Sequence, residues 1–125
     1  MRVLMMSALL LASGGVQAAK PSLDKALAGR TPGKAQGCIQ QSWIDQTDIF
    51  DDGSILYHMK AGPDYLNTPS PRCTALRSYA GLVSRTTTGQ LCSGDIVQVV
   101  DFASRFNYGS CGLGDFVPYP RVKKR

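Results

Sequence analysis

Short runs of apolar and β-branched residues, each only a few positions long, alternate with polar turns along most of this chain. The clearest run covers residues 96–102, IVQVVDF, and favours a strand because β-branched side chains pack well on a pleated surface. In residues 54–60, the odd-numbered side chains are expected to share one face and the even-numbered ones the other, because side chains alternate along a strand. Other extended pieces are expected at residues 38–43, 65–67, 82–87, 91–92 and 116–119.

Turn signals separate these pieces at intervals of about eight to twelve residues. Asp51, Asp52 and Gly53 predict a hairpin, because glycine accepts the positive φ that such turns require. Residues 73–79 fit either a helical turn or a loop, and residues 106–109 are expected to loop back between two strands. The pattern therefore predicts a mainly β fold, either a small antiparallel sheet or a barrel-like domain.

Residues 1–18, MRVLMMSALLLASGGVQA, have the pattern of an export signal. Arg2 precedes an uncharged apolar run, and Val16 and Ala18 are small enough for a cleavage site. The apolar run is about half as long as the roughly 20 residues that a membrane-spanning helix needs. We therefore expect a signal peptide at residues 1–18 and a periplasmic or secreted protein with no transmembrane segment.

The rest of the chain is expected to have three parts. Residues 19–37 predict a basic flexible linker, in which Ser22 could cap a short helical turn over residues 23–28 ended by Gly29. Residues 38–120 predict a single β-rich domain, and residues 121–125 a basic tail.

The net charge of +5 at pH 7 is concentrated in these flanks, since eight aspartates outnumber five lysines and arginines between residues 37 and 120. The tail could make a weak contact with an anionic surface, although a solvated end is the simpler interpretation. Export argues against a nucleic-acid partner. The chain contains no glutamate, a good helix former, and this also favours a β domain.

The predicted export determines how the four cysteines are interpreted, which are Cys38, Cys73, Cys92 and Cys111. In an oxidising compartment an even number of cysteines in a small domain predicts disulfides, here two. No C-x-x-C pair is present, so a thioredoxin-type redox site and a zinc site are both poorly supported. Three pairings are possible, and we favour Cys73 with Cys92 and Cys38 with Cys111.

Several short motifs follow one another in order: DDGSILY at residues 51–57, LCSGD at residues 91–95 and CGLGDFVPY at residues 111–119. With the four-cysteine spacing, they resemble the domain-of-unknown-function 6491 family of small exported bacterial proteins. The resemblance extends from Cys38 to Tyr119. It implies a secreted or periplasmic β-rich domain and implies no activity. The chain departs from the family pattern after Asn67, where another apolar residue is expected.

Two groups of residues are candidate metal ligands. Asp45, Asp48, Asp51 and Asp52 form an acidic cluster, but their spacing and the lack of glutamate do not fit a calcium loop, so hairpin turns and solvated charges are expected. His58, the single histidine, could pair with Met59 at a copper site, but adjacent strand residues point to opposite faces. We therefore expect no metal or other cofactor.

No catalytic set is visible. Ser93 lacks a neighbouring base, and His58 is the single histidine that could serve as one. Asp95 and Asp115 follow glycines and are expected to shape turns through side-chain bonds to backbone N–H groups. The leading hypothesis is thus a non-enzymatic binding or structural domain of the cell envelope. The alternative is a small hydrolase or metal-dependent enzyme using Asp95, Asp115 and His58.

Aromatic side chains are the remaining candidates for binding. Most are expected in the core, and a residual exposed strip of Tyr65, Tyr108 and Tyr119 would suit an envelope protein, peptide or glycan partner. These candidate aromatic residues are Trp43, Tyr57, Tyr65, Phe102, Phe106, Tyr108, Phe116 and Tyr119.

Overall fold

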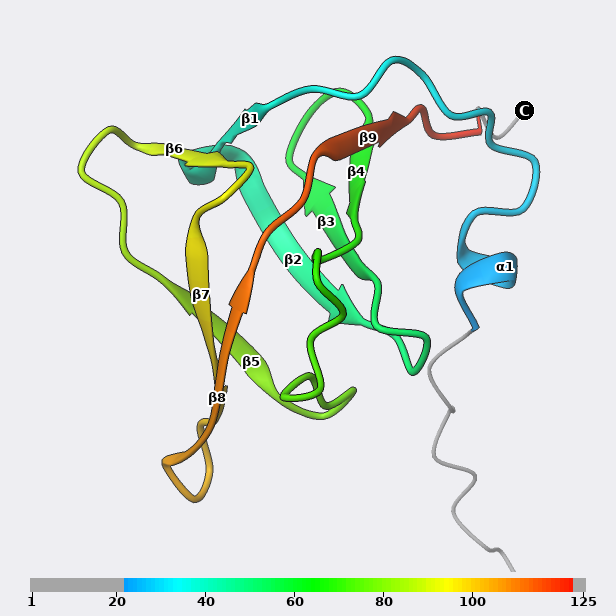
Figure 1. Cartoon of the computed structure of the whole chain (residues 1–125). Coiled ribbons are helices and arrows are strands. Elements are labelled where there is room, and N and C mark those ends of the chain that lie inside the picture. Colours follow the sequence, from blue (N-terminus) through cyan, green and yellow to red (C-terminus); the bar gives the residue numbers. More distant parts are fainter. Residues whose placement is uncertain (1–21, 123–125) are drawn as a thin grey trace, which may run out of the picture.

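The computed structural model describes residues 22–122, which form three antiparallel sheets and very little helix (Figure 1). The prediction of a mainly β fold with small antiparallel sheets is confirmed. The predicted signal peptide, and residues 19–21 and 123–125, lie outside the described residues. The elements in order are α1 (Leu23–Ala26), β1 (Cys38–Gln40), the 3-10 helix η1 (Gln41–Trp43), β2 (Ile44–Ile49), β3 (Ile55–Met59), β4 (Asp64–Asn67), β5 (Gly81–Ser84), β6 (Gln90–Cys92), β7 (Ile96–Asp101), β8 (Phe106–Gly112) and β9 (Phe116–Tyr119).

The largest sheet has the strand order β2-β3-β4-β9. The predicted hairpin joins β2 to β3, and the carboxylate of Asp52 accepts hydrogen bonds from the backbone N–H and the hydroxyl of Ser54 at 3.0 and 3.1 Å. Gly53 has a φ of 90°, the left-handed conformation that favours glycine at this turn. The strand pattern and the turn chemistry of the sequence therefore agree here.

The second sheet, β5-β7-β8, corrects one expectation. Residues 106–109, which were expected to loop back, begin β8, and Phe106 and Asn107 pair with Asp101 and Val100 of β7. The register shifts within the β7–β8 pair at Val99 and Val100, and Gly109 there has a φ of 128°. A bulge at this glycine lets a polar, weakly strand-like segment pair with the strong strand beside it.

The shorter of the two connections between the larger sheets is residues 113–115, where β8 runs almost directly into β9 (Figure 1). Asn67, which is fully buried in β4, holds this junction. Its amide group donates to the carbonyl of Gly114 at 2.7 Å, and its oxygen accepts from the Gly114 N–H at 3.0 Å. The backbone of Gly114 passes so close to Thr68 that a Cβ there would lie 2.5 Å from the Thr68 carbonyl oxygen.

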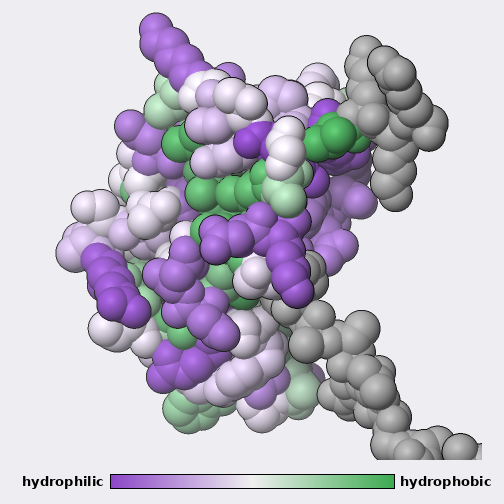
Figure 2. Space-filling model, turned by 90° about the vertical axis from the view of Figure 1, so that its right-hand side faces the viewer, coloured by the Kyte–Doolittle hydropathy of each residue, from purple (hydrophilic) through white to green (hydrophobic). Residues whose placement is uncertain are grey.

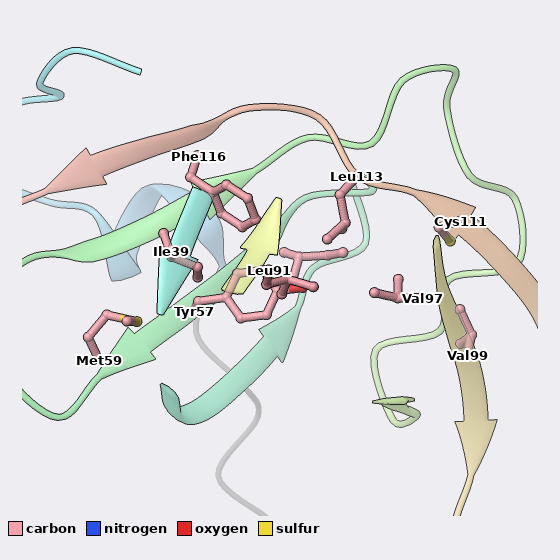
Figure 3. Close-up of a cluster of buried hydrophobic side chains, with 10 residues drawn as sticks. Ile39, Tyr57, Met59, Leu91, Val97, Val99, Cys111, Leu113 and Phe116 are labelled. Atoms are coloured by element: carbon pink, nitrogen blue, oxygen red, sulfur yellow. The ribbon is translucent and has the colours of Figure 1, made fainter. Parts of the chain in front are cut away.

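The core is one cluster to which all three sheets contribute (Figure 3). Tyr57 and Phe116, from the largest sheet, pack with ring centroids 5.8 Å apart. Ile39 and Leu91, which pair across the β1–β6 ribbon, project into the same cluster. Val97 and Val99 of β7 are fully buried and complete it from the second sheet. The ribbon thus closes the space between the two larger sheets.

Both disulfides form, but the pairing that we favoured is wrong. Cys38 bonds to Cys92, and Cys73 bonds to Cys111. Cys38 and Cys92 are direct partners in the β1–β6 ladder, with Cα atoms 4.0 Å apart, so strand register decides this bond. The second bond ties the loop before β5 to β8. Sequence spacing alone could not reveal that β1 pairs with β6.

Residues 30–36, expected to belong to a flexible linker, instead run beside β9. The Gly33 N–H donates to the Pro118 carbonyl at 2.8 Å, and Gln36 and Phe116 exchange two backbone hydrogen bonds. The expected helical turn is present as α1, although the Ser22 side chain makes no capping bond. Among residues 22–122, no helix reaches the length and apolarity that crossing a membrane requires.

Candidate functional site

Asp64, at the start of β4, is an almost fully buried carboxylate, 1% exposed, that holds together distant parts of the chain. It accepts hydrogen bonds from Arg30 at 2.8 Å, from Arg121 at 3.0 Å and from the backbone N–H of Met59 at 3.0 Å. Arg121 also donates to the carbonyl of Met59. Burial raises the pKa of Asp64, but the bonds from Arg30, Met59 and Arg121 and the charge of His58 outweigh it and hold that pKa below its usual value.

His58, the candidate catalytic or metal-binding residue, lies between two carboxylates. Its Nδ1 is 3.2 Å from Asp64 Oδ2, and its Nε2 is 2.8 Å from Asp48 Oδ2. Each ring nitrogen of His58 therefore faces a carboxylate oxygen of the protein, and neither nitrogen is left to abstract a proton from a substrate. We name the group Arg30, Asp48, His58, Asp64 and Arg121 the Asp64 cluster.

The neighbouring Met59 points the other way, into the core, where it is 3% exposed. The alternation of side chains along β3 therefore separates the two atoms that a His–Met copper site would need. Within the described part of the chain, no group of three histidine, cysteine, aspartate or glutamate residues has the arrangement to hold a metal ion.

The acidic cluster of the sequence divides into separate roles. Asp52 shapes the β2–β3 turn through Ser54, as expected. Asp48 belongs instead to the Asp64 cluster through His58. Asp45 and Asp51 are exposed. The four aspartates therefore do not act together: one shapes a turn, one belongs to an ion-pair network, and two face solvent.

The other two residues of the enzyme hypothesis do not join His58. The carboxylate of Asp95 accepts the backbone N–H of Cys92 at 2.8 Å, which closes the turn between β6 and β7 as expected. Asp115 is exposed, and the turn beside it is held by Asn67. Ser93 is exposed in the β6–β7 turn, and its N–H donates to the Gly37 carbonyl at 2.6 Å.

The aromatic residues depart most from expectation. Tyr57 and Phe116 are buried, but Trp43, Phe102 and Phe106 are 55%, 65% and 57% exposed. The expected strip of Tyr65, Tyr108 and Tyr119 does not form. Tyr108 lies in the second sheet, and the β4–β9 register pairs Tyr65 with Pro118 and Asp64 with Tyr119. Tyr65 and Tyr119 consequently project from opposite faces of the largest sheet.

A different aromatic group forms on the second sheet, and it includes Tyr79, which is not among the binding candidates of the sequence. The rings of Tyr79 and Phe106 meet the ring of Tyr108 edge-on, with centroids 6.0 and 4.9 Å away. The guanidinium of Arg77 lies 5.2 Å from the centre of the Tyr108 ring. The hydroxyl of Tyr108 donates to that of Tyr79, and this bond raises the pKa of Tyr108. We name these four residues the aromatic–arginine surface.

This surface adjoins a pocket of about 470 Å³, within the usual size range of ligand sites. Arg77 and Tyr79 line it together with Arg72, Thr74 and Phe50. The Cys73–Cys111 bond anchors the loop that carries these residues to β8. The position of Tyr79 could not be read from the sequence, because no strand periodicity extends over residues 73–80.

The basic flanks also have internal roles. Arg30 and Arg121, which we had expected in solvated flanks, are paired with Asp64. On the side of the molecule where α1 lies, hydrophobic residues form a band bordered by hydrophilic ones (Figure 2). This described surface is therefore of mixed polarity.

Comparison of the chain with protein-family models, with curated proteins and with solved structures finds no match, so the resemblance noted in the sequence stays an expectation.

Proposed function

We propose that this chain is an exported cell-envelope protein, periplasmic or secreted, whose β domain acts as a non-enzymatic binding or structural module. The export pattern at residues 1–18 supports this location. The two disulfides also support it, because such bonds persist in oxidising compartments.

The observation that carries the proposal is the aromatic–arginine surface. Tyr79 and Phe106 are 68% and 57% exposed, although they pack against Tyr108. Aromatic and arginine side chains are enriched at the centres of protein interfaces, where they contribute much of the binding energy. A protein or peptide of the envelope is the partner that this chemistry favours.

The alternative, a small hydrolase or metal-dependent enzyme using Asp95, Asp115 and His58, has less support. His58 is paired with two carboxylates, and the carboxylate of Asp95 is hydrogen-bonded within its own turn. A catalytic group needs to reach the proton or atom on which it acts. His58 and Asp95 are committed to contacts within the protein instead, and Asp115 does not join either of them.

The test is capture of envelope proteins by the oxidised, processed product of the full chain. We expect Tyr79→Ala together with Phe106→Ala to abolish recovery of a reproducible partner. Ile96→Ala is the matched control, because Ile96 is a similarly exposed hydrophobic residue, 61% exposed, that lies outside the aromatic–arginine surface. Equal recovery by the wild type and the double variant would contradict the proposal.

A further inference from the structure

We propose that a second hollow, beside Trp43, binds a neutral saccharide. The hollow has a volume of about 320 Å³, at the lower end of the range of about 300–1,000 Å³ for small-molecule sites. Its walls include Trp43 of η1, Tyr65 of β4, and Gln40 and Gln90 of the β1–β6 ribbon. None of its residues belongs to the aromatic–arginine surface, so the inference does not depend on the function proposed for that surface.

Trp43 gives the hollow an open aromatic wall. Its side chain is 55% exposed, and its backbone carbonyl accepts a hydrogen bond from the Lys60 N–H at 2.7 Å, which fixes the position of η1 beside β3. The face of an indole ring carries negative charge density, and the weakly positive C–H groups on one face of a sugar ring pack well against it. Tyr65 adds a second, half-buried aromatic ring.

Glutamine amides supply the polar groups. Gln40 and Gln90 are direct partners in the ribbon. The preceding pair, Ile39 and Leu91, points into the core. Because side chains alternate along a strand, the two glutamines face outward. Among residues 22–122, no hydrogen-bond partner engages the side chains of Gln36, Gln40 and Gln90, so their amides are open to a ligand. Each amide offers both donors and an acceptor. Sugar hydroxyls have the same dual character, so the amides match them.

The lining also restricts the class of ligand, because no side chain that lines the hollow is charged. A charged ligand would lose its hydration there without gaining an opposite charge. A wholly apolar ligand would leave the glutamine amides covered and without partners. A neutral saccharide, which has apolar ring faces and hydroxyl edges, satisfies both parts of the lining.

The walls are held before any ligand arrives. The Cys38–Cys92 bond joins the two ribbon strands one pair away from the Ile39–Leu91 pair. Backbone bonds from Gln41 to Gly89 at 3.0 Å and from Ser93 to Gly37 at 2.6 Å fix the ribbon ends. A preformed site loses less conformational entropy on binding.

The experiment uses the fluorescence of Trp43, because it is the single tryptophan in the chain and its emission reports on this hollow alone. The oxidised, processed product of the full chain is titrated with maltohexaose, cellohexaose and chitohexaose up to millimolar concentration. We expect at least one of them to give a saturable blue shift, as the indole loses contact with water. Unchanged emission with all three would overturn the proposal.

Variants then locate the binding. Gln40→Ala and Gln90→Ala keep the tryptophan and are each expected to raise the Kd about fivefold to tenfold, the effect of losing a hydrogen bond worth about 1 kcal/mol. Gln98→Ala, at an exposed position on β7, is the matched control and should leave the Kd unchanged. Equal Kd values for Gln40→Ala and Gln98→Ala would overturn the proposal. Equally tight binding of trigalacturonic acid would also overturn it, because the ligand class would then not be neutral.

Discussion

The hydroxyl of Tyr57 lies inside the core and, among the described residues, is a buried side-chain oxygen without a hydrogen-bond partner (Figure 3). Burial also raises the pKa of this phenol, so it stays neutral. Tyr57→Phe removes the unsatisfied oxygen and keeps the ring against Phe116. We expect it to raise the free energy of unfolding by about 1 kcal/mol, measured by urea denaturation. Tyr65→Phe, at the paired position on β4, should change it by less than about 0.5 kcal/mol. A loss of stability in Tyr57→Phe would contradict this account.

Asp64 is the second residue whose substitution is informative. Asp64→Asn keeps an acceptor for the Met59 N–H but removes the charge that pairs with Arg30 and Arg121. We expect the free energy of unfolding to fall by about 2 kcal/mol, since hydrogen bonds between charged groups contribute about 1.5–3 kcal/mol and Arg121 is partly solvated. Asp115→Asn, at an exposed carboxylate, is the matched control and should change it by less than about 0.5 kcal/mol. Equal losses in the two variants would show that the pairing contributes nothing.

The same residue predicts a pH dependence. Because the folded-state pKa of Asp64 lies below its usual value of 3.8, the unfolded chain binds this proton more readily than the folded one. The stabilisation is therefore complete well above pH 3.8 and is lost as the pH falls through the lower, folded-state pKa. We expect the difference in unfolding free energy between the wild type and Asp64→Asn to be fully present at pH 5 and to shrink at pH 3 and below. Urea denaturation at several pH values measures it, and a difference that grows in acid would contradict the sign.

At the scale of elements, the junction between β8 and β9 decides how the sheets meet. A Cβ at Gly114 would lie 2.5 Å from a backbone oxygen that cannot move without shifting β4. We expect Gly114→Ala to lower the free energy of unfolding by about 1–3 kcal/mol, as other overpacked sites do. Gly37→Ala is the matched control, since a Cβ there meets nothing within 4 Å, and it should be nearly neutral in the same thermal or urea denaturation. Similar changes in the free energy of unfolding for the two substitutions would show that the backbone at Gly114 can shift without cost.

Most strands were predictable because their signals are local. The β2–β3 hairpin depends on the turn residues beside it, and β7 depends on its own β-branched side chains. The beginning of β8 was missed because its residues are weak strand formers, and their extended conformation comes from pairing with β7. On β3, Leu56 lies on the face opposite Tyr57, yet both side chains are buried. The alternation of side chains therefore predicted which residues share a face, but not that both faces of this strand are covered.

The candidate sites were far less predictable, because they depend on contacts between distant residues. Asp95 was assigned correctly, since its partner is three residues away in the same turn. Tyr79 and Tyr108 are 29 residues apart, and Arg30 and Asp64 are 34 apart. No spacing rule joins such pairs, because sheet topology decides which distant segments become neighbours.

For the molecule as a whole, the Cys73–Cys111 bond connects stability to the proposed binding surface. On the chain-entropy account, closing a loop of 38 residues contributes about 4 kcal/mol. We expect Cys73→Ala with Cys111→Ala to lower the free energy of unfolding by about 2–4 kcal/mol and to speed amide hydrogen exchange in residues 72–79. Cys38→Ala with Cys92→Ala should give a comparable loss of stability without faster exchange in that loop. Equal rates of amide hydrogen exchange in residues 72–79 of both double variants would show that the Cys73–Cys111 bond does not hold this loop in place.

The Asp64 cluster also brings together the two ends of the part of the chain that the structure describes, residues 22–122. Arg30 and Arg121 bind the same carboxylate, and a Cβ at Gly29 would lie 3.4 Å from Val122, so the two ends of the folded unit are neighbours. Proteins with adjoining ends accept circular permutation, in which the original ends are joined by a short peptide and the chain is opened elsewhere. The exposed turn at residues 87–89, between β5 and β6, is a suitable opening point. A circularly permuted chain can therefore follow the strands in a different sequence order while every strand keeps its pairing partner.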